Sequence, residues 1–315
     1  MDAQIAAKIQ QLLDNIEQVV YGKHDVVKLC VIGLLARGHV LIEDVPGIGK
    51  TTIAQSIAKS LDCSFNRIQF TSDMLPSDIL GVSMLEPKSN SFEFRKGPIF
   101  ASIVLADEVN RTPPKTQSAL LEAMSENQVS IDGKTHVLPQ PFMVMATQNP
   151  IEYEGTYILP ESQLDRFSIR VEMGYPPPAD EIRIMRRRNP HRFIQDLEPV
   201  LTVEDVLELQ DKVGEVIVDD SVARFMLAIV EGTRTHEQVQ LGASPRGSLA
   251  YYEICQARAL VEGRDYVTPG DVKEMAVPVL SHRLLVKSRG ADLSMAAQER
   301  ARVIREILKR TEVPV

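Results

Sequence analysis

Short apolar runs alternate with helix-like apolar spacing through the first half of the chain. The pattern predicts helices before residue 20 and over residues 24–35. It then predicts five strands, over residues 40–42, 65–70, 102–106, 142–146 and 167–171. The first and third runs are almost continuously apolar, as strands buried on both faces are. Strands that alternate with helices favour an α/β fold, in which helices cover both faces of a parallel sheet.

A run of three prolines, Pro176–Pro178, ends this pattern. Proline lacks a backbone N–H donor and interrupts regular structure, so we place a domain boundary there. The pattern beyond it is mainly helical. Helix starts are expected at Thr202, Ser244 and Thr268. We therefore predict an α/β core over residues 1–175 and an α-helical domain over residues 176–315.

Two stretches within the predicted core read as β-hairpins. Residues 81–97 contain the polar turn Lys88-Ser89-Asn90 followed by alternating Phe92 and Phe94, and residues 128–137 contain the turn pair Asp132-Gly133. Either hairpin would cover the core or face a partner, and the residues alone leave both alternatives open.

Composition narrows the class of protein. The 315 residues are 44% hydrophobic and 25% charged, with a net charge of −8. These values are typical of a globular protein, and the acidic balance argues against a dedicated nucleic-acid binder. The basic cluster Arg186–Arg188, with Arg183 and Arg192, is interpreted as a solvated helix face or a subunit contact.

The same composition argues against several kinds of site and location. Three widely spaced cysteines favour neither a zinc site nor a disulfide framework. The apolar runs are far shorter than the roughly 20 residues of a membrane span, and the N-terminus does not resemble a signal peptide. We therefore expect a cytoplasmic protein without a membrane span.

The first strand leads into a glycine-containing loop and then a helix, which is the layout of a phosphate-binding loop. Gly47 and Gly49 would let backbone N–H groups face an anion, and Lys50 would reach the outer phosphates. The Thr51 hydroxyl would bind Mg²⁺. The usual first glycine of such a loop is Asp44 here.

Two carboxylates follow the third strand, at the edge where open α/β sheets bind ligands. We assign Asp107 to Mg²⁺ and Glu108 to the activation of water as general base. The alternative is an ordinary acidic helix start after a strand. The phosphate loop one βα unit earlier favours the catalytic interpretation.

Three further polar residues are candidates. The amide of Asn149 would contact the γ-phosphate or the attacking water, although Asn-Pro is also a common turn. Arg166 would pair with an internal carboxylate or act on the nucleotide of another subunit. Arg246 would reach phosphate oxygens if the helical domain folds over the nucleotide.

Together these motifs resemble the MoxR family of AAA+ ATPases over essentially the whole chain. The segments that carry the resemblance are Glu43–Thr51, Leu75–Gly81, Ala106–Arg111, Pro113–Met124, Ala146–Pro150 and Leu164–Phe167. Asp44 fits this family, whose loop commonly reads Asp-Val-Pro-Gly. The resemblance implies a sheet of order 5-1-4-3-2 and an α-helical lid.

The resemblance also implies roles. Asp107 and Glu108 look like Walker B, Asn149 like sensor 1, Arg166 like the arginine finger and Arg246 like sensor 2. The nucleotide would be held by the Walker A loop, with Val20, Tyr21 and Gly22 lining the adenine pocket. The loop residues are Val45, Pro46, Gly47, Ile48, Gly49, Lys50, Thr51 and Thr52.

The expected activity is Mg²⁺-dependent ATP hydrolysis in a homo-oligomeric ring, most simply a hexamer. Such a ring would remodel or mature a client protein, including by metal insertion, often with a partner that carries a von Willebrand factor A domain. The alternatives are a chelatase-type or DNA-associated motor and an ATP-gated scaffold with little turnover.

Overall fold

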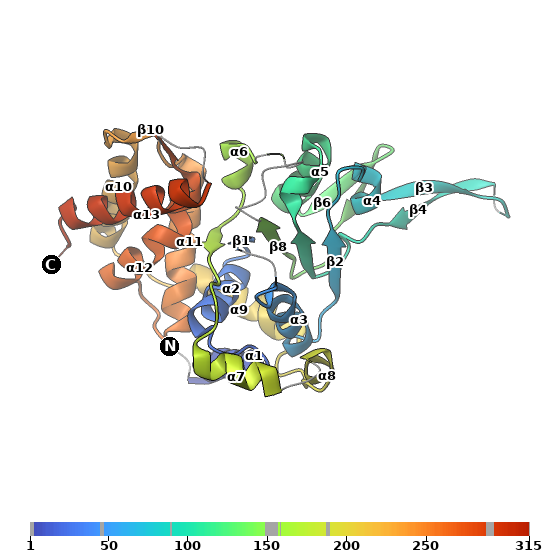
Figure 1. Cartoon of the computed structure of the whole chain (residues 1–315), viewed down its shortest axis with the longest axis horizontal. Helices are drawn as coiled ribbons and strands as arrows, with labels where there is room; N and C mark the ends of the chain where they lie inside the picture. The colour runs from blue at the N-terminus through green and yellow to red at the C-terminus, as the bar shows by residue number, and fades with distance from the viewer. Residues whose placement is uncertain are drawn as a thin grey trace.

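The computed structural model describes residues 3–44, 47–88, 90–148, 157, 159–186, 190–287 and 293–314. Its centre is a parallel five-stranded sheet with the strand order β2-β5-β8-β1-β9 (Figure 1). Counted among these five strands alone, that order is the predicted 5-1-4-3-2. The strands are β1 (Val40–Glu43), β2 (Phe65–Gln69), β5 (Ile103–Asp107), β8 (Met143–Gln148) and β9 (Ile169–Val171).

Helices cover both faces of this sheet, as the alternation of strands and helices predicts. Successive strand residues enter different apolar clusters: Val40 and Ile42 pack in one, and Leu41 packs in the other. The first cluster contains side chains of α1 to α3, and the second contains side chains of α4 and α5. These helices are α1 (Ala3–Glu17), α2 (His24–Leu35), α3 (Lys50–Ser60), α4 (Pro76–Leu80) and α5 (Pro114–Glu126).

The region after the prolines is mainly helical. The predicted helix starts are confirmed, because the side chains of Thr202, Ser244 and Thr268 each cap a helix. A two-stranded sheet of β10 (Val239–Leu241) and β11 (Leu285–Val286) was not predicted. The helices are α7 (Pro178–Arg186), α8 (Pro190–Gln195), α9 (Val203–Glu215), α10 (Asp220–Thr235), α11 (Pro245–Val261), α12 (Pro269–Leu280) and α13 (Leu293–Arg310).

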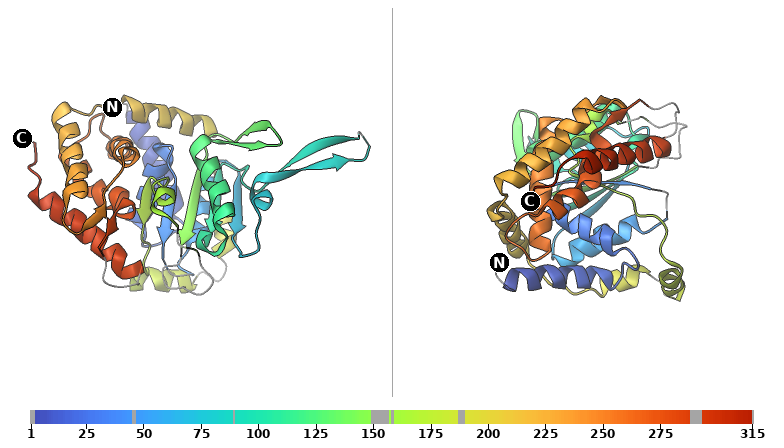
Figure 2. Two further views of the ribbon diagram at one scale, coloured as in Figure 1. Left: turned by 90° about the horizontal axis from the view of Figure 1, so that it is seen from above. Right: turned by 90° about the vertical axis from the view of Figure 1, so that its left-hand side faces the viewer.

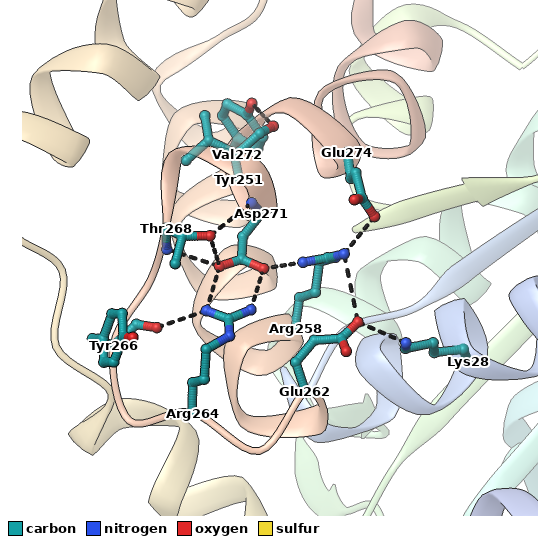
Figure 3. Close-up of polar contacts among 10 residues, drawn as sticks. All are labelled: Lys28, Tyr251, Arg258, Glu262, Arg264, Tyr266, Thr268, Asp271, Val272 and Glu274. Carbon is teal, nitrogen blue, oxygen red and sulfur yellow. Dashed lines mark hydrogen bonds and ion pairs between the residues drawn. The ribbon is translucent and has the colours of Figure 1, made fainter. Parts of the chain in front are cut away.

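The C-terminal helices pack directly against the N-terminal ones. Lys28 of α2 pairs with Glu262 after α11 at 2.6 Å, and the Gln210 amide donates to the carbonyl of Leu34 at 2.7 Å (Figure 3 shows the first contact). The first apolar cluster also includes residues from both sides of residue 176. The domain boundary at that residue therefore stays a prediction.

Both predicted hairpins are present. β3 (Gly81–Glu86) pairs with β4 (Ser91–Lys96), and β6 (Gln128–Ile131) pairs with β7 (Lys134–Val137). The first projects away from the body of the molecule (Figures 1 and 2). The rings of Phe94 and His136 stack with their centroids 4.0 Å apart and thereby join the two hairpins. The remaining short elements are η1 (Val109–Arg111), α6 (Glu161–Leu164) and η2 (Ser281–Arg283).

Candidate functional site

The loop between β1 and α3 has the backbone that a phosphate-binding loop needs. Gly47 and Gly49 have φ of +85° and +96°, in the left-handed region that favours glycine. A Cβ on either residue would meet no atom within 4 Å, so the positive φ, and not close packing, requires glycine here. Val45 and Pro46 lie outside the described residues. The N-terminus of α3, which begins at Lys50, opens at this loop.

Lys50 lies among acidic groups at the carboxyl edge of the sheet. Its Nζ donates to the backbone carbonyl of Asp44 at 2.6 Å. Burial lowers the pKa of Lys50, and the negative charges of Asp107, Asp44 and Glu108 oppose that shift. The structure thus brings the predicted phosphate-binding cation close to both predicted catalytic carboxylates. Thr51 and Thr52 follow in the first turn of α3 and are half-buried.

Asp107 ends β5 and is held from both neighbouring strands. Its Oδ1 accepts from the hydroxyl of Thr147 at 2.6 Å, and its Oδ2 accepts from Nη2 of Arg67 at 2.5 Å. Thr147 lies on β8 and Arg67 on β2. The carboxylate therefore has a fixed orientation, as a ligand for a metal ion must.

Glu108 has a left-handed backbone, with φ +60° and ψ +50°. This conformation is uncommon for a residue other than glycine, and strained backbone of this kind is enriched at functional sites. The Glu108 amide donates to the Thr147 hydroxyl at 2.9 Å, so this one hydroxyl contacts both acidic residues. The Glu108 carboxylate accepts from Gln69 at 2.8 Å and pairs with Arg111 at 3.1 Å. Asn149 lies outside the described residues.

A cavity of about 390 Å³ adjoins the loop. Val20 and Tyr21, the predicted adenine-pocket residues, line it together with Gly47, Ile48, Gly49 and Thr52. Gly22 lines an adjacent cavity instead. Most of the wall is apolar, as a site for a planar base would be.

About half of this cavity wall could not be predicted from the sequence. Met173, Tyr175, Ile184 and Phe193 line it from beyond the fifth strand. Lys23 fixes part of that segment, because its Nζ donates to the carbonyls of Met173 at 2.6 Å, Gly174 at 2.9 Å and Tyr175 at 2.8 Å. The prolines in that segment predicted only the end of regular structure, not a cavity wall.

The residues that hold the two carboxylates were not predicted either. Nothing in the strand patterns of Arg67, Gln69 and Thr147 marks them as contacts of Asp107 or Glu108.

Arg166 and Arg246 lie together, away from the loop. Nη1 of Arg166 donates to the carbonyl of Leu121 at 2.9 Å and to the hydroxyl of Ser125. Nη2 of Arg246 donates to that same hydroxyl at 3.2 Å. The Arg166 guanidinium thus binds a carbonyl and a hydroxyl on α5, and neither group is the internal carboxylate that was one of its two alternatives.

This arginine pair lies at the amino edge of the sheet. The charge of Arg246 helps to lower the pKa of His39, and His39 directly precedes β1. The phosphate loop follows β1, and a strand of four residues spans about 13 Å. Arg246 therefore does not lie beside Lys50 of its own chain, contrary to the expectation that the helical domain folds over the nucleotide.

One residue of the predicted basic cluster reaches the edge of this site. Arg183 lies over the ring of Tyr21, 4.2 Å from its centroid, and Arg187 and Arg188 lie outside the described residues. Among the described residues, there is no cluster of three or more His, Cys, Asp or Glu side chains suited to a metal ion. Nor does the described part of the chain contain a helix with the length and hydropathy of a membrane span.

Comparisons with known proteins agree with this geometry. Residues 39–169 match the model of the ATPase family associated with various cellular activities (AAA), and residues 231–309 match the AAA lid domain. A crystal structure of a Cytophaga hutchinsonii protein superposes with a TM-score of 0.89 at 36% identity, covering 99% of this chain and 96% of that one.

Two relatives cover most of the chain. The Bacillus subtilis protein YeaC is 49% identical over 96% of this chain and 94% of its own length. Chaperone MoxR1 of Mycobacterium tuberculosis is 41% identical over 88% of this chain and 76% of its own length. With the fold, the phosphate loop and the paired carboxylates, these matches show that the chain belongs to the MoxR family of AAA ATPases.

Proposed function

We propose that the chain binds ATP with Mg²⁺ at the loop before α3 and hydrolyses it. The observation that carries this proposal is the arrangement of Lys50, Asp107 and Glu108 at one edge of the sheet. Lys50 and the loop amides would hold the phosphates, while the apolar cavity at Tyr21 would hold the adenine. ATP is thus expected to span the loop and the cavity beside it.

The residues present fit a magnesium ion. Thr51 offers a hydroxyl and Asp107 an oriented carboxylate, which are oxygen ligands of the kind that Mg²⁺ prefers when it also binds phosphates. When bound, the ion would neutralise charge on the phosphates. The Asp107 carboxylate is already directed by Thr147, so binding need not reorder that side chain.

Glu108 would take a proton from the attacking water. At present its carboxylate is occupied by Gln69 and Arg111, so it must turn away from them to act. Asn149, two residues beyond Thr147, would help to orient the water. This assignment follows from the family resemblance, because Asn149 lies outside the described residues.

We propose that Arg166 acts on the nucleotide of a neighbouring subunit, which requires a ring-shaped homo-oligomer, most simply a hexamer. Arg166 is at the edge of the sheet away from its own loop and is therefore more available to a neighbour. Arg246 shares Ser125 with Arg166, so it would face the same nucleotide. Arg246 would then act as sensor 2 on the nucleotide of the neighbouring subunit and not on that of its own.

The proposed outcome of hydrolysis is remodelling or maturation of a client protein in the cytoplasm. The name of the relative MoxR1 describes it as a chaperone. The projecting hairpin carries exposed apolar side chains, including Met84 and Phe92, that a client could contact. We also propose, from the family resemblance alone, a partner that carries a von Willebrand factor A domain and a role in metal insertion.

The base assignment is tested with Glu108→Gln. This variant should bind ATP normally and hydrolyse it about 100-fold or more slowly, because it lacks the general base. Glu122→Gln, an exposed change on α5, is the matched control and should hydrolyse at the parental rate. A parental rate in Glu108→Gln would show that another group activates the water.

Action between subunits is tested by mixing. Arg166→Ala and Lys50→Ala proteins should each be inactive alone. Mixed rings contain sites in which an intact loop meets an intact Arg166, so turnover should partly return. Absence of recovery, despite co-assembly shown by native mass spectrometry, would contradict action in trans.

A further inference from the structure

Arg283, at the end of η2, is a buried arginine whose contacts converge on one loop. Its side chain is 1% exposed. Nε donates to Oδ1 of Asp165 at 2.8 Å, and Nη2 donates to the carbonyl of Phe167 at 2.7 Å. Nη1 donates to the carbonyl of Ser168 at 3.3 Å and also to that of Val279. One guanidinium therefore binds three residues of the loop that precedes β9.

Arg283 keeps its charge in this position. Burial lowers its pKa to about 10, and the Asp165 carboxylate opposes the shift, so it is protonated at neutral pH. The fold also makes room for it: a Cβ on Gly247 would lie 2.8 Å from Cδ of Arg283. Glycine is a poor helix former, so its presence in the first turn of α11 is explained by this close approach.

The second oxygen of Asp165 is held by α11. Oδ2 accepts from the hydroxyl of Ser244 at 2.7 Å. Ser244 is also the N-cap of α11, because its Oγ accepts from the amide of Gly247 at 3.1 Å. Both residues that bind the Asp165 side chain thus come from the region that matches the lid domain.

These contacts lie at the bases of the two arginines that meet at Ser125. Asp165 directly precedes Arg166, and Ser244 is two residues before Arg246. A shift of the Asp165 carboxylate would move the start of α11 and the loop that bears Arg166 together. The Asp165 side chain is 18% exposed, so solvent screens its interactions with Arg283 and Ser244 only in part.

We propose that Asp165, Ser244 and Arg283 form a positioning triad. The triad fixes the positions of Arg166 and Arg246 relative to each other, so that both can contact the nucleotide of a neighbouring subunit. This rests on the proposed action of Arg166 in trans. The triad ties the lid to the arginine finger, so a displacement of the lid in one subunit would reach the catalytic site of the next.

Ser244→Ala and Ser244→Thr form the first test. Alanine removes the hydrogen bond to Asp165, and kcat for ATP should fall about 10- to 100-fold, because small misplacements of a catalytic group have effects of that size. KM should change by less than about twofold, since the loop that binds ATP is at the other edge of the sheet. Threonine can donate the same bond and should keep most of the activity.

Asp165→Asn tests the carboxylate itself. Its two oxygens accept one from Arg283 and one from Ser244, whereas an amide has one acceptor oxygen and an NH2 group that only donates. Its kcat should fall in the same way. Mixed rings with Lys50→Ala should recover turnover, since that partner supplies an intact triad and an intact Arg166. Glu262→Gln, which alters the other end of α11 and does not touch Asp165, is the matched control and should keep kcat.

Hydrogen–deuterium exchange gives a readout independent of activity. In Ser244→Ala, the amides of residues 165–168 and 246–248 should exchange faster together, with little change at the loop before α3. Parental kcat in both Ser244→Ala and Asp165→Asn, or unchanged exchange in residues 165–168, would overturn the triad while leaving Arg166 in place. If Arg166→Ala itself keeps the parental rate, the proposed action in trans is wrong and the triad falls with it.

Discussion

Nη2 of Arg67 lies 2.5 Å from Oδ2 of Asp107, so an arginine occupies one oxygen of the carboxylate proposed to bind the metal. The pair joins β2 to β5 at the carboxyl edge of the sheet. A second contact in the same direction, from Gln69 to Glu108 at 2.8 Å, holds the neighbouring carboxylate. Both acidic residues are thus engaged by β2, the strand that leads toward α4 and the projecting hairpin.

Arg67→Gln should strengthen the binding of Mg²⁺ together with ATP. Removal of the Arg67 charge leaves the charge of the Asp107 carboxylate uncompensated and frees its Oδ2 for the ion. The Arg67 side chain is 48% exposed, so the effect is modest. We expect the Mg²⁺ concentration for half-maximal nucleotide binding to fall about fivefold, which corresponds to about 1 kcal/mol. Titration with a fluorescent ATP analogue would measure it.

Arg67→Lys is the control for that experiment and should stay near the parental value, because it keeps the charge. A higher Mg²⁺ requirement in Arg67→Gln would show the opposite role, in which the guanidinium orients Asp107 for the metal.

Asp271→Asn should destabilise the C-terminal helices. The Asp271 side chain is 0% exposed and pairs with Arg258 and with Arg264, the latter at 2.6 Å (Figure 3). Removing its charge leaves two arginines without their shared carboxylate, at a cost of about 3 kcal/mol in unfolding free energy. Denaturant unfolding followed by circular dichroism would measure the change.

Glu274→Gln tests the same network from its exposed side. Glu274 also pairs with Arg258 but is 64% exposed, so the loss should be below about 1 kcal/mol. Equal losses in the two variants would show that burial does not govern the strength of this network.

We expect the protein to lose stability in mild acid because His39 is buried in a neutral form. Its Nδ1 accepts from the amide of Val144 at 3.0 Å, and its Nε2 donates to the carbonyl of Met124 at 3.0 Å. Burial lowers its pKa from 6.5 to about 4, and the charge of Arg246 adds to that shift. As the pH falls below 6.5, the unfolded chain binds a proton that the folded chain does not, so stability falls until about pH 4.

Between pH 7 and pH 5, His39 should therefore reduce the free energy of unfolding by about 2 kcal/mol. Urea unfolding at the two pH values would measure the total change, to which the buried His282 adds with the same sign because its pKa is also lowered. His39→Gln should show a smaller change by about that amount. An unchanged pH dependence would show that His39 titrates normally in the folded protein.

The two hairpins should move as one unit through the stack of Phe94 on His136. Phe94→Ala should raise hydrogen exchange in residues 128–137 as well as in residues 81–96, because the ring contact is lost from both sides. Phe92→Ala is the matched control: Phe92 is 71% exposed, so the second hairpin should be unaffected. Faster exchange confined to residues 81–96 in Phe94→Ala would show that the hairpins are independent.

Local patterns predicted much of the fold, including the glycine-containing loop that leads into α3. Gly47, Gly49 and Lys50 are close in sequence, and each would act through its own backbone or charge, so their spacing alone indicates the proposed chemistry. Likewise, Asp107 and Glu108 follow an apolar strand, and strand ends in a parallel sheet meet at one edge. The helix caps at Thr202, Ser244 and Thr268 are also local, which is why they were predicted correctly.

The contacts that orient those residues depend on strand order and helix packing. Arg67 meets Asp107 only because β2 lies beside β5, and Arg246 meets Arg166 only because α11 packs near the end of α5. A sequence pattern reports which residues share a strand or a helix face, but not which distant element approaches them. The sequence by itself therefore determined the glycine-containing loop before α3 and the two carboxylates after the third predicted strand. Tertiary packing decided that Arg246 lies at the opposite edge from Lys50, next to Arg166.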